Sequence, residues 1–191
     1  MDFEFDKFTE EWAQIYAPMK HTPGIDGTNK RFFICDSYMA MTEFMTGMEP
    51  DSSPCVIIES QQEGNVDHGK DYPRYAMYFM VRATEMNDGH EAVKAKKSAK
   101  QVMIDFVNFI RPFKYYEDYG KLIEEIEFKE GSYLYQLREA VRTGDYCMQN
   151  ISIDNFTYES LNQLYDGWYG VQLSLEDMRS YSMCLDQDNY K

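Results

Sequence analysis

Three histidines are the residues of this sequence best suited to proton transfer or metal binding, and their spacing supports neither. His21, His68 and His90 are expected in loops or at a helix start. None is paired with a second histidine at the i, i+4 spacing that places two metal ligands on one helix face. The chain also lacks the Gly-x-Ser-x-Gly pattern of a hydrolase nucleophile. We therefore interpret the histidines as surface residues and expect no catalytic site.

The four cysteines, at positions 35, 55, 147 and 184, include no Cys-x-x-Cys metal or redox pair. Cys35, Cys55 and Cys147 each fall within a predicted strand, where a free thiol packs as a small apolar side chain. We interpret them as reduced core residues of a protein assembled inside a cell. The acidic N-terminus differs from a secretory signal peptide, and no apolar run approaches the length of a membrane span.

Carboxylates offer another route to metal binding. Asp154, Glu159 and Asp166 could meet near the last predicted hairpin and hold a cation, but they lack the ligand spacing of a calcium loop. We expect no metal and no cofactor. Glu124 and Glu125 belong to a second acidic run, and such a run on a helix is typical of a solvated face.

A single basic cluster stands out in a chain whose formal net charge is −14. It lies on the first half of the longest predicted helix and consists of Lys94, Lys96, Lys97 and Lys100. Positive charge near a helix N-terminus opposes the helix dipole, so a partner surface could compensate for it. We interpret Lys94, Lys97 and Lys100 as a subunit interface that faces Glu124 and Glu125 of another copy. The alternative is a solvated lysine face.

The acidic excess also restricts the classes of partner. With 33 acidic and 19 basic residues, the chain repels nucleic acid, and sequence-specific binding would need a local basic patch. A ring whose lumen is lined with acidic residues would let DNA pass without specific binding. A well-solvated surface is the simpler explanation of the same charge.

The elements that position these residues are organised around a strand at 72–83 and a long helix that follows it. Apolar residues alternate along the strand, which predicts one apolar face and one mixed face. Apolar residues then recur at helical spacing, Asp88 is placed to cap the helix with Glu91 in a capping box, and Pro112 is expected to end it.

The remaining segments complete a two-layer pattern. In the first part of the chain, sequence periodicity and turn residues predict a helix at 6–17, strands at 31–36 and 55–59, a helical turn or a methionine-rich loop at 39–48, and a polar loop at 61–70. After the long helix they predict a helical insert at 113–145, with Ser132 and Gly144 as caps. A hairpin with strands at 146–157 and 169–175 around a bend at 163–170 follows, and then a loose tail at 178–191. We predict one α+β domain over 1–191, with a mostly antiparallel sheet and the long helix packed across one face.

The order of these elements resembles tailed-bacteriophage neck and tail-completion proteins, in particular the tail terminator family. The resemblance covers about 1–177, and its local motif is the hairpin segment Asp166-Gly167-Trp168-Tyr169-Gly170-Val171 with the alternating strand to Leu175. It implies a structural virion protein, assembled in the bacterial host cytoplasm, that forms a hexameric or dodecameric ring around the DNA channel. Such a ring caps or connects the tail and contacts head-completion proteins and the tail tube, without catalysis.

The resemblance gives the last hairpin a role as well. Asp166 and Gly167 would form its bend, and Trp168 and Tyr169 would shape it, either as core residues or as the contact to the next ring. The alternative to a ring protein is an acidic soluble adaptor or immunity-type module that binds a basic protein partner.

Overall fold

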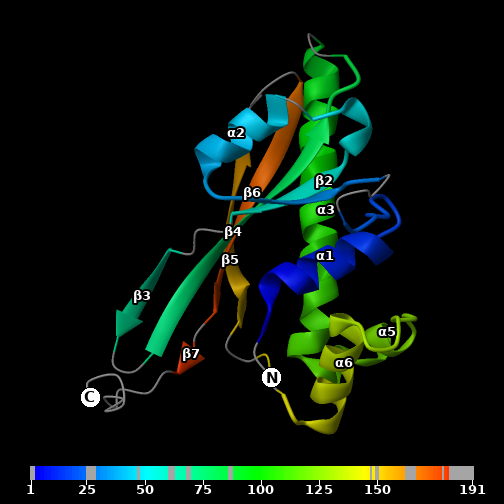
Figure 1. Ribbon diagram of the computed structural model, residues 1–191, viewed down its shortest axis with the longest axis vertical. Helices are drawn as coiled ribbons and strands as arrows, with labels where there is room; N and C mark the ends of the chain where they lie inside the picture. The colour runs from blue at the N-terminus through cyan, green and yellow to red at the C-terminus, as the bar shows by residue number, and fades with distance from the viewer. Residues whose placement is uncertain are drawn as a thin grey trace.

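A mixed sheet forms the centre of the molecule, with the strand order β1-β2-β4-β6-β5 (Figure 1). The computed structural model describes residues 3–24, 29–46, 48–59, 63–67, 70–85, 88–146, 148, 151–161, 167–177 and 179–180. The strands are β1 (Phe32–Cys35), β2 (Cys55–Glu59), β3 (Glu63–Asp67), β4 (Lys70–Arg82), β5 (Ile151–Leu161), β6 (Trp168–Asp177) and β7 (Arg179–Ser180). Strands β1 and β2 are parallel, while the other pairs are antiparallel, including β3 and β7 on β4. The predicted α+β class with a mostly antiparallel sheet is confirmed.

Helices cover both faces of this sheet. They are α1 (Phe5–Ile15), α2 (Tyr38–Thr46), α3 (Gly89–Lys114), α4 (Tyr116–Tyr119), α5 (Lys121–Glu124) and α6 (Tyr133–Thr143), together with a 3₁₀ turn at Pro50–Ser52. The long helix α3 runs the length of one face, with α1 and α6 on the same side and α2 on the other (Figure 1).

The middle of strand β4 is buried on both faces, although one of its rows is mixed in composition, as the sequence predicts. Met77 and Phe79 belong to the main core beneath α1 and α3. Tyr78 and Met80 point to the opposite face and pack in a second cluster with Met41 of α2. The alternating pattern identified the strand correctly, and α2 on the second face buries the large apolar residues of that row, while Arg74 of the same row is exposed.

Helix α3 begins where the sequence predicts and ends later. The Asp88 carboxylate accepts a hydrogen bond of 2.7 Å from the His90 backbone N–H, as an N-cap does. Pro112 does not end the helix, which continues to Lys114. Proline removes the hydrogen bond to the carbonyl of Asn108, an exposed residue. Phe113 is 1% exposed, so its packing holds the last turn in place.

Several boundaries differ from the predictions because tertiary pairing decides them. The expected loop at 61–70 contains β3, which pairs with the first half of β4. Strand β5 begins at Ile151 rather than at 146 and continues to Leu161, because it pairs with β6 up to Gly170. Residues 39–46 are helical, within α2. Part of the predicted loose tail, Arg179–Ser180, is β7.

The helical insert is confirmed, and it joins the main core. Ser132 caps α6, and Gly144 ends that helix in the left-handed conformation with φ 78°. Leu134 and Leu137 are buried in the same cluster as α1 and α3. The Glu11 carboxylate of α1 accepts from the backbone N–H groups of Tyr133 and Leu134, at 2.8 and 2.7 Å. The insert is therefore fixed to the rest of the molecule by packing and by this second cap.

Candidate functional site

The first half of α3 presents an exposed basic surface. Between residues 90 and 101 it carries four lysines and one glutamate. Lys94 and Lys97 are exposed, and the Lys94 ammonium lies 3.3 Å from a carboxylate oxygen of Glu91. A shallow hollow on this face is lined by His90, Val93, Lys94, Lys97, Ser98 and Gln101. We call this set the basic end of α3.

Two other lysines of the cluster turn toward the sheet. The Lys100 ammonium donates a hydrogen bond of 2.8 Å to the Tyr158 hydroxyl and lies 4.8 Å from the centre of that ring. Lys96 lies 5.6 Å from the Tyr169 ring centre. These cation–π contacts tie α3 to β5 and β6. Sequence reasoning missed the Lys100 contact because the predicted strand at 146–157 did not reach Tyr158, and it missed the Lys96 contact because periodicity does not show which helix residue a strand residue meets.

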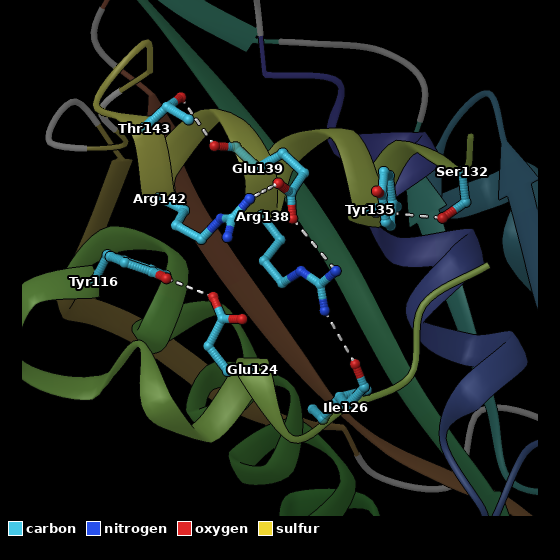
Figure 2. Close-up of polar contacts among 9 residues, drawn as sticks. All are labelled: Tyr116, Glu124, Ile126, Ser132, Tyr135, Arg138, Glu139, Arg142 and Thr143. Carbon is cyan, nitrogen blue, oxygen red and sulfur yellow. Dashed lines mark hydrogen bonds and ion pairs between the residues drawn. The ribbon is translucent and has the colours of Figure 1, made fainter. Parts of the chain in front are cut away.

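The opposite end of α3 leads into an exposed acidic surface on α4 and α5. Between residues 117 and 127 the chain carries five exposed acids and one exposed lysine. Glu124 accepts from the Tyr116 hydroxyl, as Figure 2 shows, whereas Glu125 is exposed. Tyr119 and Leu122 are also exposed on this surface, by 46% and 59%. We call residues 117–127 the acidic end.

A groove separates the acidic end from the last turn of α6. Its lining includes Tyr115, Tyr116, Lys121, Glu124, Arg142 and Tyr146. Polar contacts hold its wall in place, since Arg142 pairs with Glu139, and Arg138 reaches both Glu139 and the carbonyl of Ile126 (Figure 2). Arg138 also lies 5.2 Å from the Phe128 ring centre.

The two charged ends do not meet within one molecule. Helix α3 lies along the longest axis, with its N-terminus at the top and α4 and α5 at the bottom in Figure 1. At 1.5 Å per residue, positions 94 and 114 are about 30 Å apart. Lys94 and Lys97 can therefore contact Glu124 or Glu125 only in a different copy.

The hairpin bend is built by Gly167, whose φ of 82° is left-handed and favours glycine. Trp168 is 0% exposed and packs in the cluster beneath α2, and Tyr169 is 6% exposed between β6 and α3. The sequence left open whether Trp168 and Tyr169 are core residues or a contact to the next ring, and both side chains are buried in the core of this chain. Asp166 lies outside the described residues.

His21 is buried, which corrects its interpretation as a surface residue. Its side chain is 4% exposed, its Nδ1 accepts a hydrogen bond of 3.0 Å from the Arg31 backbone N–H, and its Nε2 lies 3.6 Å from Glu10. Burial lowers the pKa of this imidazole. His90 is exposed at the start of α3, and His68 lies outside the described residues.

Two of the cysteines follow the core interpretation. Cys35 and Cys55 are free and buried in strands, and burial raises the pKa of both thiols. Cys147 and Cys184 lie outside the described residues.

Metal binding and membrane insertion find no support in the described part of the chain. There, no group of three or more His, Cys, Asp or Glu side chains could hold a metal ion. This finding does not test the carboxylates that the sequence suggested could hold a cation. Asp166 and the side chain of Asp154 lie outside what the structure describes, and Glu159 is exposed. No helix in the described ranges is long and apolar enough to cross a membrane.

Comparison with known proteins does not assign the chain to a family. No family model matches it, and no curated protein matches it.

Proposed function

We propose that this chain is a structural virion protein that forms a ring at the head–tail junction of a tailed bacteriophage, as a tail terminator or neck ring. Hexameric or dodecameric rings would surround the DNA channel and connect head-completion proteins to the tail tube. Support comes from the order of elements, because the resemblance to this family rests on a helix, a sheet, a long helix and a final hairpin. The structure has these elements in that order.

The observation that carries the proposal is the separation of opposite charges by the length of α3, with lysines on its first turns and acids on α4, α5 and the residues after them. A basic face at one end and an acidic face at the other suit a head-to-tail contact, in which each copy uses a different surface on each side. Such contacts close into a ring when the rotation between copies allows it. All five charges of the proposed contact are exposed. Lys97 and Glu125 are joined there by Lys94, which pairs with Glu91, and by Lys100 and Glu124, which bond the hydroxyls of Tyr158 and Tyr116 within the chain.

The test is the mass of the purified protein in solution at low and high salt. A charge-steered ring gives a mass of six or twelve subunits that falls as salt rises, because salt screens exposed charges. In the double variant Lys94→Glu, Lys97→Glu, we expect assembly to weaken while the monomer stays folded. A ring of unchanged size and stability in this variant contradicts the proposed interface.

A matched control separates this interface from a general effect of charge. Lys20 and Lys129 are exposed and lie outside α3. The double variant Lys20→Glu, Lys129→Glu changes the net charge by the same amount, and we expect it to assemble as the wild type does.

The second candidate is an acidic soluble adaptor or immunity-type module. It is favoured by the exposed acids of α4 and α5, which could receive a basic protein partner. A monomer that stays stable at every concentration and salt level would support this candidate over a ring.

A further inference from the structure

We propose that Val93 of one copy packs against Tyr119 and Leu122 of the next copy, as the apolar centre of the head-to-tail contact. This inference rests on the proposed self-association and names the residues that give it affinity. Charged rims mainly steer association, whereas a buried apolar anchor supplies most of the binding free energy in typical interfaces.

The first part of the argument is the exposure of Val93. Val93 is 52% exposed near the start of α3, on the surface that also carries Lys94 and Lys97. Lys97 follows it by four residues, so the two side chains are neighbours on the helix surface. Val93 is thus an exposed apolar residue beside lysines, in the lining of a shallow hollow.

The acidic end has the same arrangement with the opposite charge. Tyr119 and Leu122 are 46% and 59% exposed. The backbone of Gly120 and Glu125 is right-handed helical, so positions from 116 to 125 follow helical spacing. Asp118 and Glu125 are exposed four residues before and three residues after Leu122, and they form an acidic rim around the two apolar side chains.

Charge complementarity identifies the occupant as a second copy of this chain. Each patch has an apolar centre and a charged rim, and the rims carry opposite signs. About 30 Å of α3 separates them, so they can pair only between molecules. The two patches are different, so the contact is heterologous, and each copy keeps one unused patch for its next neighbour.

The experiment uses two full-length variants that block opposite patches. Val93→Glu and Leu122→Glu each place a carboxylate at the apolar centre of one patch, where the contact would bury it away from water. Each variant alone should lose the ring and show at least about a thirty-fold weaker association, the size of effect found at interface hot spots.

Mixing the two variants tests the pairing directly. Val93→Glu retains an intact acidic end, and Leu122→Glu retains an intact basic end, so an equimolar mixture should form a dimer of twice the monomer mass. Assembly should stop there, because a further contact would bring the two introduced carboxylates together. The control is Met39→Glu on α2, where the wild-type side chain is 73% exposed, and it should assemble as the wild type does.

The outcomes separate this inference from the proposed function. If the wild type forms rings and both variants form them equally well, or if the mixture stays monomeric, the pairing of Val93 with Tyr119 and Leu122 is overturned while the ring stands. Loss of assembly in Met39→Glu also overturns it, because the contact then lies on another face. A wild type that stays monomeric up to about 1 mM, a concentration at which a contact with a Kd of about 1 mM or tighter would assemble, overturns both proposals.

Discussion

At the scale of single residues, His21 connects three parts of the chain through one neutral imidazole. The Arg31 N–H donates to Nδ1, which fixes the proton on Nε2 near Glu10 of α1. The backbone N–H of His21 in turn donates to the carbonyl of Ala13. A protonated Nδ1 cannot accept from Arg31, so the segment leading into β1 depends on the charge state of this ring.

This dependence predicts a loss of stability below pH 6.5. Burial lowers the pKa of folded His21 from 6.5, while Glu10 raises it and Lys30 lowers it further. The unfolded chain therefore binds more protons near and below that pH, and stability falls as pH falls, by at most about 1.4 kcal/mol per pH unit. Urea unfolding at pH 7 and pH 5 measures the loss, which should be smaller in His21→Gln. Equal losses in both proteins would contradict this role of His21.

Gly170 gives a second prediction at this scale. A Cβ at this position would lie 2.2 Å from the Met80 sulfur and 2.9 Å from the carbonyl oxygen of Phe79. Gly170 is buried opposite Met80 in the pair of β4 and β6. We expect Gly170→Ala to destabilise the fold by about 1–3 kcal/mol, the cost of overpacking a core.

A double-mutant cycle with Met80→Ala checks the cause. If the Met80 side chain is the obstacle, Gly170→Ala should cost much less in the Met80→Ala background, and the coupling energy should be of the order of 1 kcal/mol or more. Additive costs would place the obstacle at the Phe79 backbone instead.

At the scale of elements, local signals predicted α3, α6 and the central strands well. Asp88, Ser132 and Gly144 are caps whose side chain or backbone freedom acts over a few residues, and all three are used as predicted. The misplaced boundaries depend on distant partners. Pro112 stays helical because Phe113 packs in the core, and β5 is placed by its register on β6.

A second cap on α6 illustrates what local sequence cannot show. Glu11 lies on α1, more than 120 residues before the two N–H groups that it accepts from, those of Tyr133 and Leu134. A carboxylate at a helix N-terminus accepts hydrogen bonds from backbone N–H groups that have no partner within the helix, and its negative charge interacts favourably with the helix dipole. The contact therefore couples the start of the chain to the insert at 113–145.

We expect Glu11→Ala to lower the free energy of unfolding by about 1–3 kcal/mol, because it leaves two backbone donors of α6 without their carboxylate. Glu11→Gln should cost less, since its amide oxygen can still accept. Chemical unfolding measures both, with the exposed Glu127→Ala as a control that should stay within about 0.5 kcal/mol of the wild type. A loss in the control equal to that in Glu11→Ala would mean that removing an acid, rather than the cap, is responsible.

At the scale of the whole molecule, the sequence singles out two groups of charges, and the fold determines where they lie relative to one another. Lys94 and Glu125 are 31 positions apart in the sequence, and the straight course of α3 separates the start of that helix from α5 along the long axis (Figure 1). The fold also gives Lys100 a partner within the chain, because β5 brings the Tyr158 hydroxyl beside its ammonium group. Exposed Val93, Tyr119 and Leu122 had no distinctive sequence signal, since each fits a helical pattern without being buried.

The last prediction concerns DNA, which a neck ring surrounds without holding it in place. With a net charge of −14, the chain should not retard duplex DNA at about 0.15 M salt, because phosphate binding needs a basic surface that outweighs the repulsion. The basic end of α3 is the surface that could bind phosphate.

A mobility-shift titration compares the wild type with the double variant Lys94→Glu, Lys97→Glu and with the control double variant Lys20→Glu, Lys129→Glu, to decide whether the basic end binds DNA. We expect no shift with any of them. A shift by the wild type and the control that disappears in the α3 variant and weakens steeply with salt would identify the basic end as a phosphate-binding surface, and the lysines would then not be reserved for a neighbouring copy.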